Sequence, residues 1–523
     1  MPNFSLPGQV FLAAAQQYQT PFHLYDEAAI RRTARRLKAA FSGVPEFREY
    51  FAVKALPTPA ILRILKDEGC GVDCASMTEL MLVRACGFQG RDIMFSANDV
   101  PPEEFRLARE LNAYINLDDA THVATLRDNG GIPEEVCLRY NPGDAFTVAG
   151  EIMGEPKEAK YGMTRAQLSQ ALRELKAGGA KRFGLHSFLC SNTTDPAYYP
   201  ALARLLFETG VELMEETGLP LSFINLSGGI GIPYLPDAPE ADIEAIGAGV
   251  AREYDEAFTR RGIRGIAIKT ELGRYMTGPN GWLVTHIIHE KNIYRHYLGL
   301  DASACDLMRP AMYGAYHHIT IPDREDLPHD QLVDVTGSLC ENNDKFAVNR
   351  LLPKAEVGDV LVIHDTGAHG LSMGYNYNGK LRCKEVLRRE DGSFQLIRRA
   401  ETPRDYFATL DVDEVYPKLG LDCPLNEGGF ANAKESVPVP CVFRPADLGR
   451  AAPCSGGRGS DPDHSGYGGG PDSRSGRNRG ACRDPAARGQ RVRRGRSRRP
   501  GGLYRRDYRH GPEGIRTGGR QGA

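Results

Sequence analysis

The sequence has no long hydrophobic run, because no stretch reaches the roughly 18 apolar residues that a membrane-spanning helix needs. Its start, MPNFSLPGQV, has neither the basic region nor the apolar stretch of a secretory signal. We therefore expect a cytoplasmic protein without a membrane partner.

Clustered cysteines are also missing. The twelve cysteines are scattered singly, and the nearest to a pair are Cys70 and Cys74 in CGVDC. This spacing predicts neither a disulfide framework nor a zinc site. We expect reduced and mostly buried thiols, and no metal.

Net charge is nearly absent, at −2, but the two parts of the chain differ. Residues 441–523 contain 19 Arg, no Lys and seven acidic residues, a charge of +12 that leaves −14 for residues 1–440. These 83 residues also contain 19 Gly and only six Leu, Ile, Val or Phe, too few for a core, so disorder is predicted. Arginine–glycine segments can bind nucleic acid. However, the sudden loss of lysine favours translation of a GC-rich gene in a shifted frame, and we expect no nucleic-acid partner.

Apolar runs predict the fold of the first domain, residues 25–290. Its eight predicted strands are residues 49–55, 70–76, 92–97, 113–118, 135–141, 182–188, 221–229 and 266–274. Segments between them, such as 59–69, 77–87 and 200–218, place apolar residues at helical spacing. Eight strands alternating with helices predict an α/β fold built on a (β/α)8 TIM barrel.

A second domain is predicted where the pattern changes beyond residue 290. Runs such as VDVTGSLC (333–340) and DVLVIHDTGAHG (359–370) alternate with turns. We expect residues 291–412, together with 1–24, to form a mostly β domain. Residues 413–440 are expected to be a loosely structured extension before the tail.

Polar residues occupy the ends of the predicted barrel strands, where such barrels build their sites and often bind phosphate after strands seven and eight. Lys54 ends the first strand and Asp73 lies in the second. SGGIG (227–231) follows the seventh strand, and the eighth strand ends in ELGR (271–274). Bare glycines let backbone amides approach an anion, and Arg274 adds positive charge.

Lys54 and Glu271 indicate a particular cofactor. A lysine at a strand end usually extends into solvent. At a barrel mouth beside a phosphate site, however, it suits a Schiff-base enzyme. Because Glu271 can keep a pyridine nitrogen protonated, the set matches pyridoxal 5′-phosphate.

Several motifs, in order, resemble the ornithine/diaminopimelate decarboxylase family, fold-type III pyridoxal-phosphate enzymes with a barrel and a β-domain. The similarity runs from PFHLYD (21–26) to DYFATLD (405–411) and is nearest to the diaminopimelate decarboxylases. YFAVKA is similar to the segment that carries the Schiff-base lysine, and GVDCASMTEL, LRYNPG and ELGR to later barrel motifs. The resemblance implies conversion of meso-2,6-diaminopimelate to L-lysine and CO2, the last step of lysine biosynthesis. It implies the following cofactor-binding residues: Lys54 as covalent anchor, Asp73, Ser191, Gly228, Gly229, Glu271, Gly273, Arg274 and Tyr377.

The predicted β-domain carries three further resemblances. VTGSLCENND (335–344) resembles the segment that reaches the partner's active site, which implies a homodimer with shared active sites. Cys340 would then be the catalytic proton donor, with the released Lys54 as the alternative donor, and Glu341 would bind the distal amino group of the amino-acid substrate. The stretch LMRPAMYGAYH resembles the part that binds the distal carboxylate, and SMGYNYNGK the part that meets cofactor and substrate. The substrate-binding residues so implied are Arg274, Arg309, Tyr313, Glu341 and Tyr377.

The segment HSFLCSNT (186–193) departs from the family pattern. Phe188 stands where the family has a histidine stacked on the cofactor ring. Phenylalanine can stack, but it cannot donate a proton or carry charge. Cys190 replaces a glycine before Ser191, and Ser227 replaces the first glycine of a triplet. We expect Ser191 and the remaining two glycines to hold the phosphate.

Alternatives remain. An ornithine or lysine decarboxylase would leave Arg309 and Tyr313 without a carboxylate to bind. A racemase on the same architecture would need a weaker electron sink than Glu271 provides. A cofactor-binding pseudoenzyme is favoured only by Phe188. Simpler roles are a structural thiol for Cys340, a surface ion pair for Arg309, and ordinary hydrogen bonds for His317 and His318.

Overall fold

The structure is a computed structural model that describes residues 6–146 and 155–410. The predicted extension and the arginine-rich tail, residues 413–523, lie outside the described residues. In the part of the chain described, no helix is both long and apolar enough to cross a membrane.

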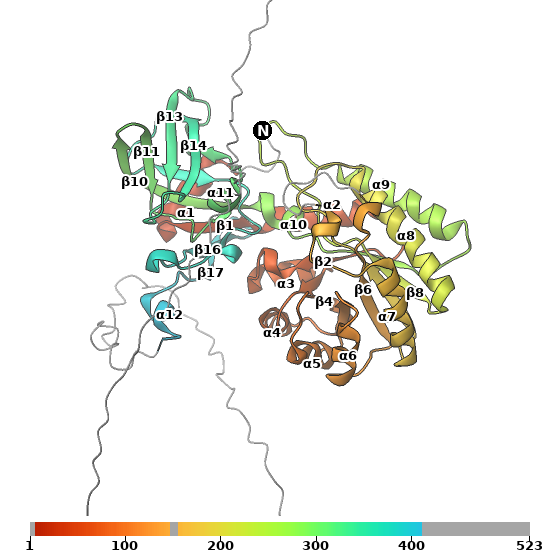
Figure 1. The fold of residues 1–523 in the computed structure, drawn as a ribbon. Helices are drawn as coiled ribbons and strands as arrows, with labels where there is room; N and C mark the ends of the chain where they lie inside the picture. The colour runs from red at the N-terminus through yellow and green to blue at the C-terminus, as the bar shows by residue number, and fades with distance from the viewer. Residues whose placement is uncertain (1–5, 147–154, 411–523) are drawn as a thin grey trace, which may run out of the picture. The chain divides into compact units, whose positions relative to one another are not determined.

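Eight parallel strands close into a barrel, which confirms the predicted (β/α)8 fold (Figure 1). The strands are β2 (Arg48–Ala52), β3 (Gly71–Cys74), β4 (Ile93–Ser96), β5 (Tyr114–Leu117), β6 (Glu135–Arg139), β7 (Arg182–His186), β8 (Leu221–Asn225) and β9 (Ala267–Thr270). The helices among them are α2 (Glu27–Ala40), α3 (Pro59–Asp67), α4 (Met77–Ala85), α5 (Pro102–Glu110), α6 (His122–Asp128), α7 (Arg165–Ala177), α8 (Tyr198–Thr217) and α9 (Ile243–Tyr254). Each predicted strand overlaps one barrel strand but runs past its carboxyl end.

Helix α3 shows how the sequence starts the barrel layer. Pro59 occupies the first turn, where a missing N–H costs no hydrogen bond. Ile61, Leu62, Ile64 and Leu65 then form one buried face. Burying each such side chain contributes about 1.5–3 kcal/mol, so packing against the strands stabilises this short helix.

The barrel floor contains a buried cation, Lys269 of β9. Its Nζ lies 4.7 Å from the ring centroid of Tyr50, 4.3 Å from that of Tyr114 and 4.8 Å from that of Phe223. It also donates a hydrogen bond of 3.1 Å to the Tyr50 hydroxyl. Burial lowers the pKa of Lys269 to about 8. The aromatic rings thus enclose the ammonium inside the floor.

The second domain is mostly β, as predicted, and forms a nine-stranded sheet with mainly antiparallel pairing (Figure 1). Its strands are β1 (Phe22–Asp26), β10 (Gly281–Asn292), β11 (His296–Leu300), β12 (Ile319–Thr320), β13 (Gln331–Thr336), β14 (Lys345–Leu352), β15 (Val360–Ile363), β16 (Lys384–Arg388) and β17 (Phe394–Arg398). The order is β14-β13-β11-β10-β1-β16-β17, and β15 pairs with β10 and β12. Short helices α10 (Arg274–Thr277), α11 (Arg309–Tyr313) and α12 (Pro403–Phe407) lie in this half of the chain.

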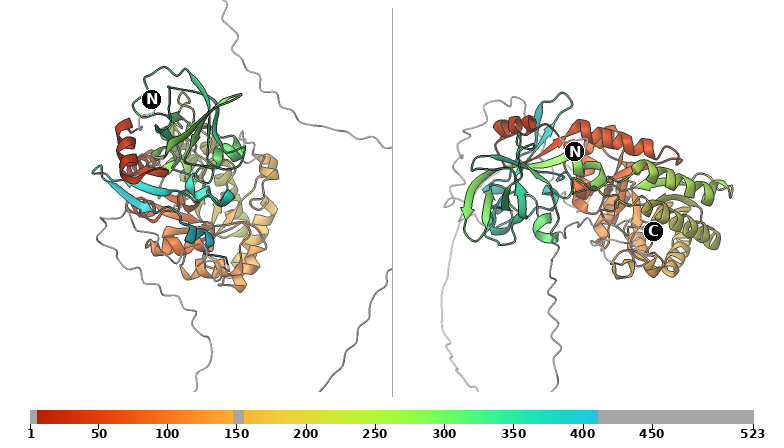
Figure 2. Two further views of the ribbon diagram at one scale, coloured as in Figure 1. Left: turned by 90° about the vertical axis from the view of Figure 1, so that its left-hand side faces the viewer. Right: turned by 90° about the horizontal axis from the view of Figure 1, so that it is seen from above.

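The N-terminal segment belongs to the sheet. Strand β1 pairs antiparallel with β10, with Phe22 opposite Val284, and parallel with β16. Helix α1 (Gly8–Tyr18) packs Phe11 edge-on against Trp282 of β10, with ring centroids 5.6 Å apart. Two further views show this red helix against the green and teal strands (Figure 2).

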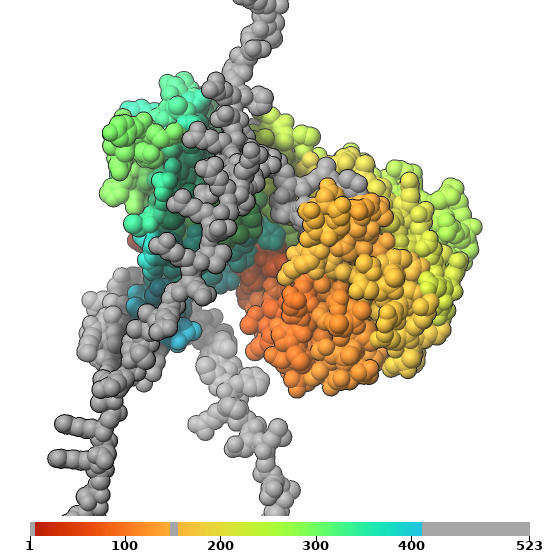
Figure 3. All heavy atoms as spheres, viewed as in Figure 1, coloured from red at the N-terminus to blue at the C-terminus, as the bar shows by residue number. Residues whose placement is uncertain are grey.

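A loop of the second domain contacts the first barrel strand's end. The backbone N–H of His369 and the hydroxyl of Ser372 both bond to the carbonyl of Ala55, at 2.9 and 3.1 Å. Figure 3 shows the two domains on the surface, with the barrel mainly orange to yellow and the β-domain green to blue. These bonds hold the β-domain loop beside the turn that carries Lys54.

Candidate active site

Lys54 lies one turn beyond the strand that was predicted to contain it. Strand β2 ends at Ala52, and Lys54 occupies a 3-10 turn formed by Val53–Ala55. Its two neighbours are buried, whereas the Lys54 side chain is 51% exposed. The core therefore fixes the turn and leaves the amine open at the barrel mouth.

Asp73 faces Lys54 because Ala52 and Asp73 pair in register between β2 and β3. The Lys54 Nζ lies 3.6 Å from Asp73 Oδ2. The pKa of Lys54 is raised above its ordinary value. Burial alone would lower this pKa, but the negative charges of Asp73, Glu271 and Glu79 have the larger effect. The amine is therefore held as an ammonium.

The Asp73 carboxyl is buried and incompletely satisfied. Neither of its oxygens has a hydrogen-bond partner among the described residues. Burial, together with the charge of Glu271, raises the pKa of Asp73 well above its ordinary value. Such a group is costly to bury alone, so its position beside Lys54 fits a site that receives a polar ligand.

Glu271, directly after β9, is the most heavily hydrogen-bonded carboxylate of the site. Its Oε1 accepts from the Asn225 amide at 2.7 Å, and its Oε2 accepts from the Ser227 hydroxyl at 3.0 Å and from His186 Nε2 at 3.1 Å. Burial alone would raise the pKa of Glu271, but His186 and the positive charge of Lys54 lower it to about 2. Glu271 is therefore an ionised, fixed acceptor inside the barrel.

Strand register builds a relay behind Glu271. Arg139 pairs with His186 between β6 and β7, and His186 pairs with Asn225 between β7 and β8. Arg139 donates to His186 Nδ1 at 3.2 Å, so the proton of this imidazole resides on Nε2 and points to Glu271. Burial lowers the pKa of His186, which keeps it neutral. Arg139 is held in turn by Asp118 at 2.8 Å.

Phe188 is linked to this relay through Tyr161. The two rings meet edge to face, with centroids 5.9 Å apart, and the Arg139 guanidinium lies 5.6 Å from the Tyr161 ring centroid. Phe188 also lies close to the glycine loop, with Cε2 3.8 Å from the position that a Cβ of Gly228 would take. Phe188 therefore lies between Tyr161 and the glycine loop.

The glycine loop after β8 joins the loop after β7. Thr193 N–H donates to the Gly229 carbonyl at 2.9 Å, and Gly231 N–H donates to the Thr193 carbonyl at 2.7 Å. A Cβ on Gly228 would lie 2.8 Å from the Glu271 carbonyl, and Gly229 has a φ of +127° that side chains rarely adopt. This bare backbone, with Ser191 in the adjoining loop, fits a phosphate group.

Gly273 packs on the lysine turn. A Cβ there would lie 2.6 Å from that of Ala55, so the start of α10 approaches the Lys54 turn directly. Arg274 follows at the first position of α10 and donates to the hydroxyl of Tyr234. The predicted cofactor residues from Lys54 to Arg274 are thus gathered at one end of the barrel.

A second arginine joins the Tyr234 ring from the β-domain. The Arg309 guanidinium lies 4.6 Å from the Tyr234 ring centroid and donates to His317 Nε2 at 2.8 Å. His317 donates through Nδ1 to the His364 carbonyl at 2.8 Å, and burial with Arg309 lowers its pKa to about 3. The sequence predicted ordinary hydrogen bonds for His317 but did not single out Tyr234, which bridges both arginines. Tyr313, at the end of α11, is 51% exposed.

Cys340, Glu341 and Tyr377 lie together on the β-domain. The backbone N–H of Cys340 donates to the side-chain oxygen of Asn378, the neighbour of Tyr377, at 2.8 Å. All three side chains are exposed, and Cys340 is the exposed one among the eight free cysteines of the described residues. No contact joins Cys340 to Lys54 within the described part of one chain. The same part contains no group of three His, Cys, Asp or Glu side chains placed to hold a metal ion.

Comparison with known proteins agrees with this arrangement. The model of the pyridoxal-dependent decarboxylase, pyridoxal binding domain, matches residues 27–278. The protein TabA of Pseudomonas amygdali pv. tabaci is 42% identical over 398 residues, covering 76% of this chain and 93% of TabA. The diaminopimelate decarboxylase of Methanothermobacter thermautotrophicus is 33% identical over 400 residues, with the same two coverages of 76% and 93%.

Solved structures share the same architecture. A crystal structure of the M. jannaschii diaminopimelate decarboxylase in complex with L-lysine is 29% identical, with a TM-score of 0.69, and covers 76% of this chain and 93% of that one. The barrel, the β-domain and the lysine site define a fold-type III enzyme. The chain belongs to the pyridoxal-dependent decarboxylase family, and its cofactor is pyridoxal 5′-phosphate.

Proposed function

We propose that this enzyme decarboxylates meso-2,6-diaminopimelate to L-lysine and CO2, the last step of lysine biosynthesis in the cytoplasm. The observation that carries the proposal is the pair Arg274 and Arg309 on one tyrosine ring, Tyr234. Two guanidinium groups beside the cofactor site suit a substrate with a second carboxylate. The diaminopimelate decarboxylases among the relatives support the same substrate.

In this proposal the barrel residues hold the cofactor. Lys54 is its covalent anchor, and Asp73 holds the lysine ammonium when the amine is released. Glu271, fixed by four side-chain donors, keeps a proton on the ring nitrogen. The phosphate of the cofactor is held by Gly228, Gly229, Gly273 and Ser191. Phe188 packs on the cofactor ring. The bound cofactor supplies an electron sink for the pair left by departing CO2.

The β-domain residues complete the proposed site from a second subunit. Cys340 donates the proton that replaces CO2, and Glu341 binds the distal amino group. Arg309 and Tyr313, with Arg274, bind the distal carboxylate, and Tyr377 meets cofactor and substrate. The exposure of Cys340 and its separation from Lys54 within one chain support a homodimer with shared sites.

A second candidate is decarboxylation of a different amino acid, such as ornithine or lysine, with the same cofactor. Phe188 at the usual histidine position favours it, as does the identity of 42% with TabA against 33% with a diaminopimelate decarboxylase. Phe188 in place of the family's histidine changes the side chain that packs against the cofactor ring. It leaves the anchor and the electron sink unchanged.

One assay separates the candidates. The purified enzyme, supplied with pyridoxal 5′-phosphate, is offered meso-diaminopimelate, D- or L-lysine and D- or L-ornithine, and CO2 and the amine products are measured. We expect CO2 and L-lysine from meso-diaminopimelate alone. Faster CO2 release from ornithine or lysine would replace the first candidate with the second.

A further inference from the structure

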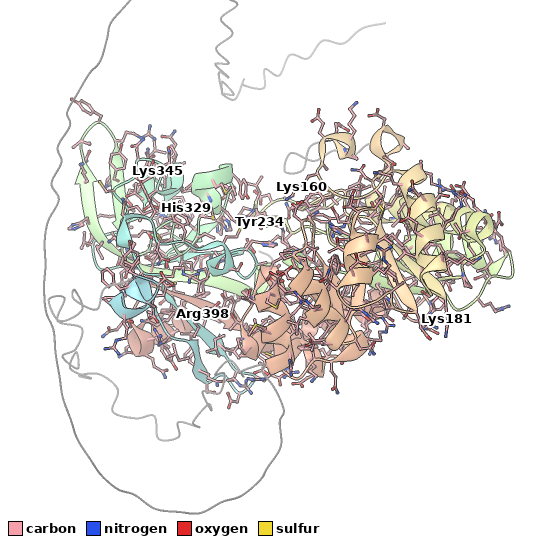
Figure 4. The ribbon with its side chains drawn as sticks, turned by 60° about the horizontal axis from the view of Figure 1, so that its bottom comes forward. Lys160, Lys181, Tyr234, His329, Lys345 and Arg398 are labelled. Carbon is pink, nitrogen blue, oxygen red and sulfur yellow. The ribbon has the colours of Figure 1, made fainter. Side chains whose placement is uncertain are left out.

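Tyr234 also lines a cavity of about 530 Å³ to which Lys54, Asp73 and Glu271 do not contribute. Its walls come from the segment after β8, from helices α1 and α2, and from the β-domain. In Figure 4, Tyr234 lies where the side chains of the barrel and the β-domain meet, and His329 of the β-domain is a further lining residue. A volume of this size accommodates a small organic ligand.

Much of the cavity wall is apolar or aromatic. Its large apolar and aromatic lining residues include Phe11, Ile232, Tyr234, Tyr275, Trp282 and Ile321. Trp282 and Phe11 already pack edge to face, and both belong to the core beneath the sheet. A rigid wall of rings binds a flat or compact apolar group at little entropic cost.

Two titratable side chains, those of His318 and Asp365, line the cavity. Nδ1 of His318 is buried and has no hydrogen-bond partner among the described residues. Burial lowers the pKa of His318 and so favours its neutral imidazole. The Asp365 carboxyl also lines the cavity, and burial raises its pKa to about 7 against the opposing charge of Arg309.

The charge of the lining favours a cation. It contains two arginines, Arg32 and Arg36, against four carboxyl groups, those of Asp237, Glu240, Glu325 and Asp365. Arg36 already bonds to Glu240 and to Glu244. Above the Asp365 pKa of about 7, the carboxylates of the lining outnumber its arginines. Together with the aromatic faces, this excess attracts an ammonium group and repels an anion.

We propose that this cavity is a second binding site, which takes a small organic cation with an aromatic or compact apolar body and one protonated amine. The amine pairs with Asp365, and the body packs against Tyr234 and Trp282. The same Tyr234 ring contacts Arg274 and Arg309, so a bound cation lies one side chain away from these arginines. The site is independent of which amino acid the enzyme decarboxylates.

The test uses the full-length holoenzyme and N,N-dimethyl-2-phenylethylamine, whose tertiary nitrogen cannot condense with the cofactor aldehyde. Calorimetry compares it with two probes of matched shape, the neutral 2-phenylethanol and the anionic 3-phenylpropionate. We expect saturable binding of the amine, at least about 10-fold tighter than that of the anion. The visible absorbance of the cofactor should stay unchanged, because the probe does not enter the lysine site.

Two variants locate the binding. Asp365 has a φ of 59°, a conformation that asparagine also adopts, so Asp365→Asn removes the charge with little backbone cost. This variant should bind the amine about 10-fold more weakly than the parent does, whereas its affinity for 2-phenylethanol should stay within about 2-fold of the parent's. Pro236→Trp, at an exposed residue of the lining, should block both probes. Cofactor absorbance and the thermal unfolding transition verify that each variant is folded. The proposal would be overturned if the parent enzyme showed no saturable binding of the amine. It would also be overturned if both folded variants bound the amine as tightly as the parent.

Discussion

His186 directs its Nε2 proton at the Glu271 carboxylate across 3.1 Å, and Arg139 fixes that tautomer by donating to Nδ1 across 3.2 Å. The carboxylate therefore meets a neutral imidazole donor with a guanidinium behind it. This arrangement keeps Glu271 ionised inside a buried site, where it can hold positive charge on a pyridine nitrogen.

Glu271→Gln should remove that charge and leave the shape of the site. We expect kcat to fall by about 100-fold or more while the cofactor still binds, because the amide cannot hold the ring nitrogen protonated. Steady-state kinetics and cofactor absorbance check this result. Glu79→Gln is a matched control, since Glu79 influences Lys54 only through its charge and should cost much less. Equal losses in both variants would contradict the role given to Glu271.

Phe188→His tests the aromatic face beside the glycine loop. A histidine there introduces a group whose ordinary pKa is about 6.5, so the pH profile of the cofactor absorbance should change near that pH relative to the parent enzyme. Phe188→Tyr keeps the ring without that titration and serves as the control. The assignment of Phe188 to the cofactor face fails if the absorbance of Phe188→His follows the same pH profile as that of the parent.

The pH dependence of stability should reveal Lys269. Its pKa in the folded chain is about 8, against 10.5 ordinarily, so the unfolded chain binds more protons between these two values. The free energy of unfolding should therefore rise as the pH increases from 8 to 10.5. Urea unfolding of the parent and of Lys269→Met at several pH values measures this free energy. Over this pH range, the parent should gain about 1–3 kcal/mol more than the variant. If the free energies of unfolding of the two proteins changed equally with pH, burying the charged Lys269 side chain would not destabilise the fold.

Complementation tests the shared site. Lys54→Ala and Cys340→Ala should each be nearly inactive alone. If Cys340 serves the partner subunit, unfolding and refolding an equal mixture should restore about one quarter of the parent activity, because half of the dimers then contain one intact site. Sedimentation analysis confirms the dimer. Mixtures that stay inactive although mixed dimers form would place both residues in the same subunit's site.

The barrel could be predicted from sequence because its strands are buried on both faces and are therefore continuous apolar runs. The β-domain could be predicted as mostly β, but its strand order could not. The long-range pairing of β1 with β10 and β16, for example, depends on contacts that no local pattern encodes. Lys54 proved to lie in a turn beyond its strand, since strand ends are set by backbone pairing rather than by composition.

The relay and the tyrosine bridge could not be predicted. Arg139 meets Asp118 and His186 only because three neighbouring strands adopt one register. Tyr234 precedes Arg274 by 40 residues in a loop, and nothing in its local sequence marks it. Lys269 interrupts an apolar strand as a visible signal, but the rings that enclose it come from three other strands.

The most direct test of the whole account is the identity of the lysine that binds the cofactor. Two lysines face the barrel interior: Lys54 is open at the mouth beside Asp73, whereas Lys269 has the lower pKa but is closed in by aromatic rings. Borohydride reduction of the holoenzyme followed by peptide mass spectrometry identifies the labelled residue. We expect the reduced cofactor on Lys54, and in Lys54→Ala we expect both the label and the visible absorbance to be lost. Label on Lys269 or another lysine, or a Lys54→Ala enzyme with full absorbance and turnover, would contradict this expectation.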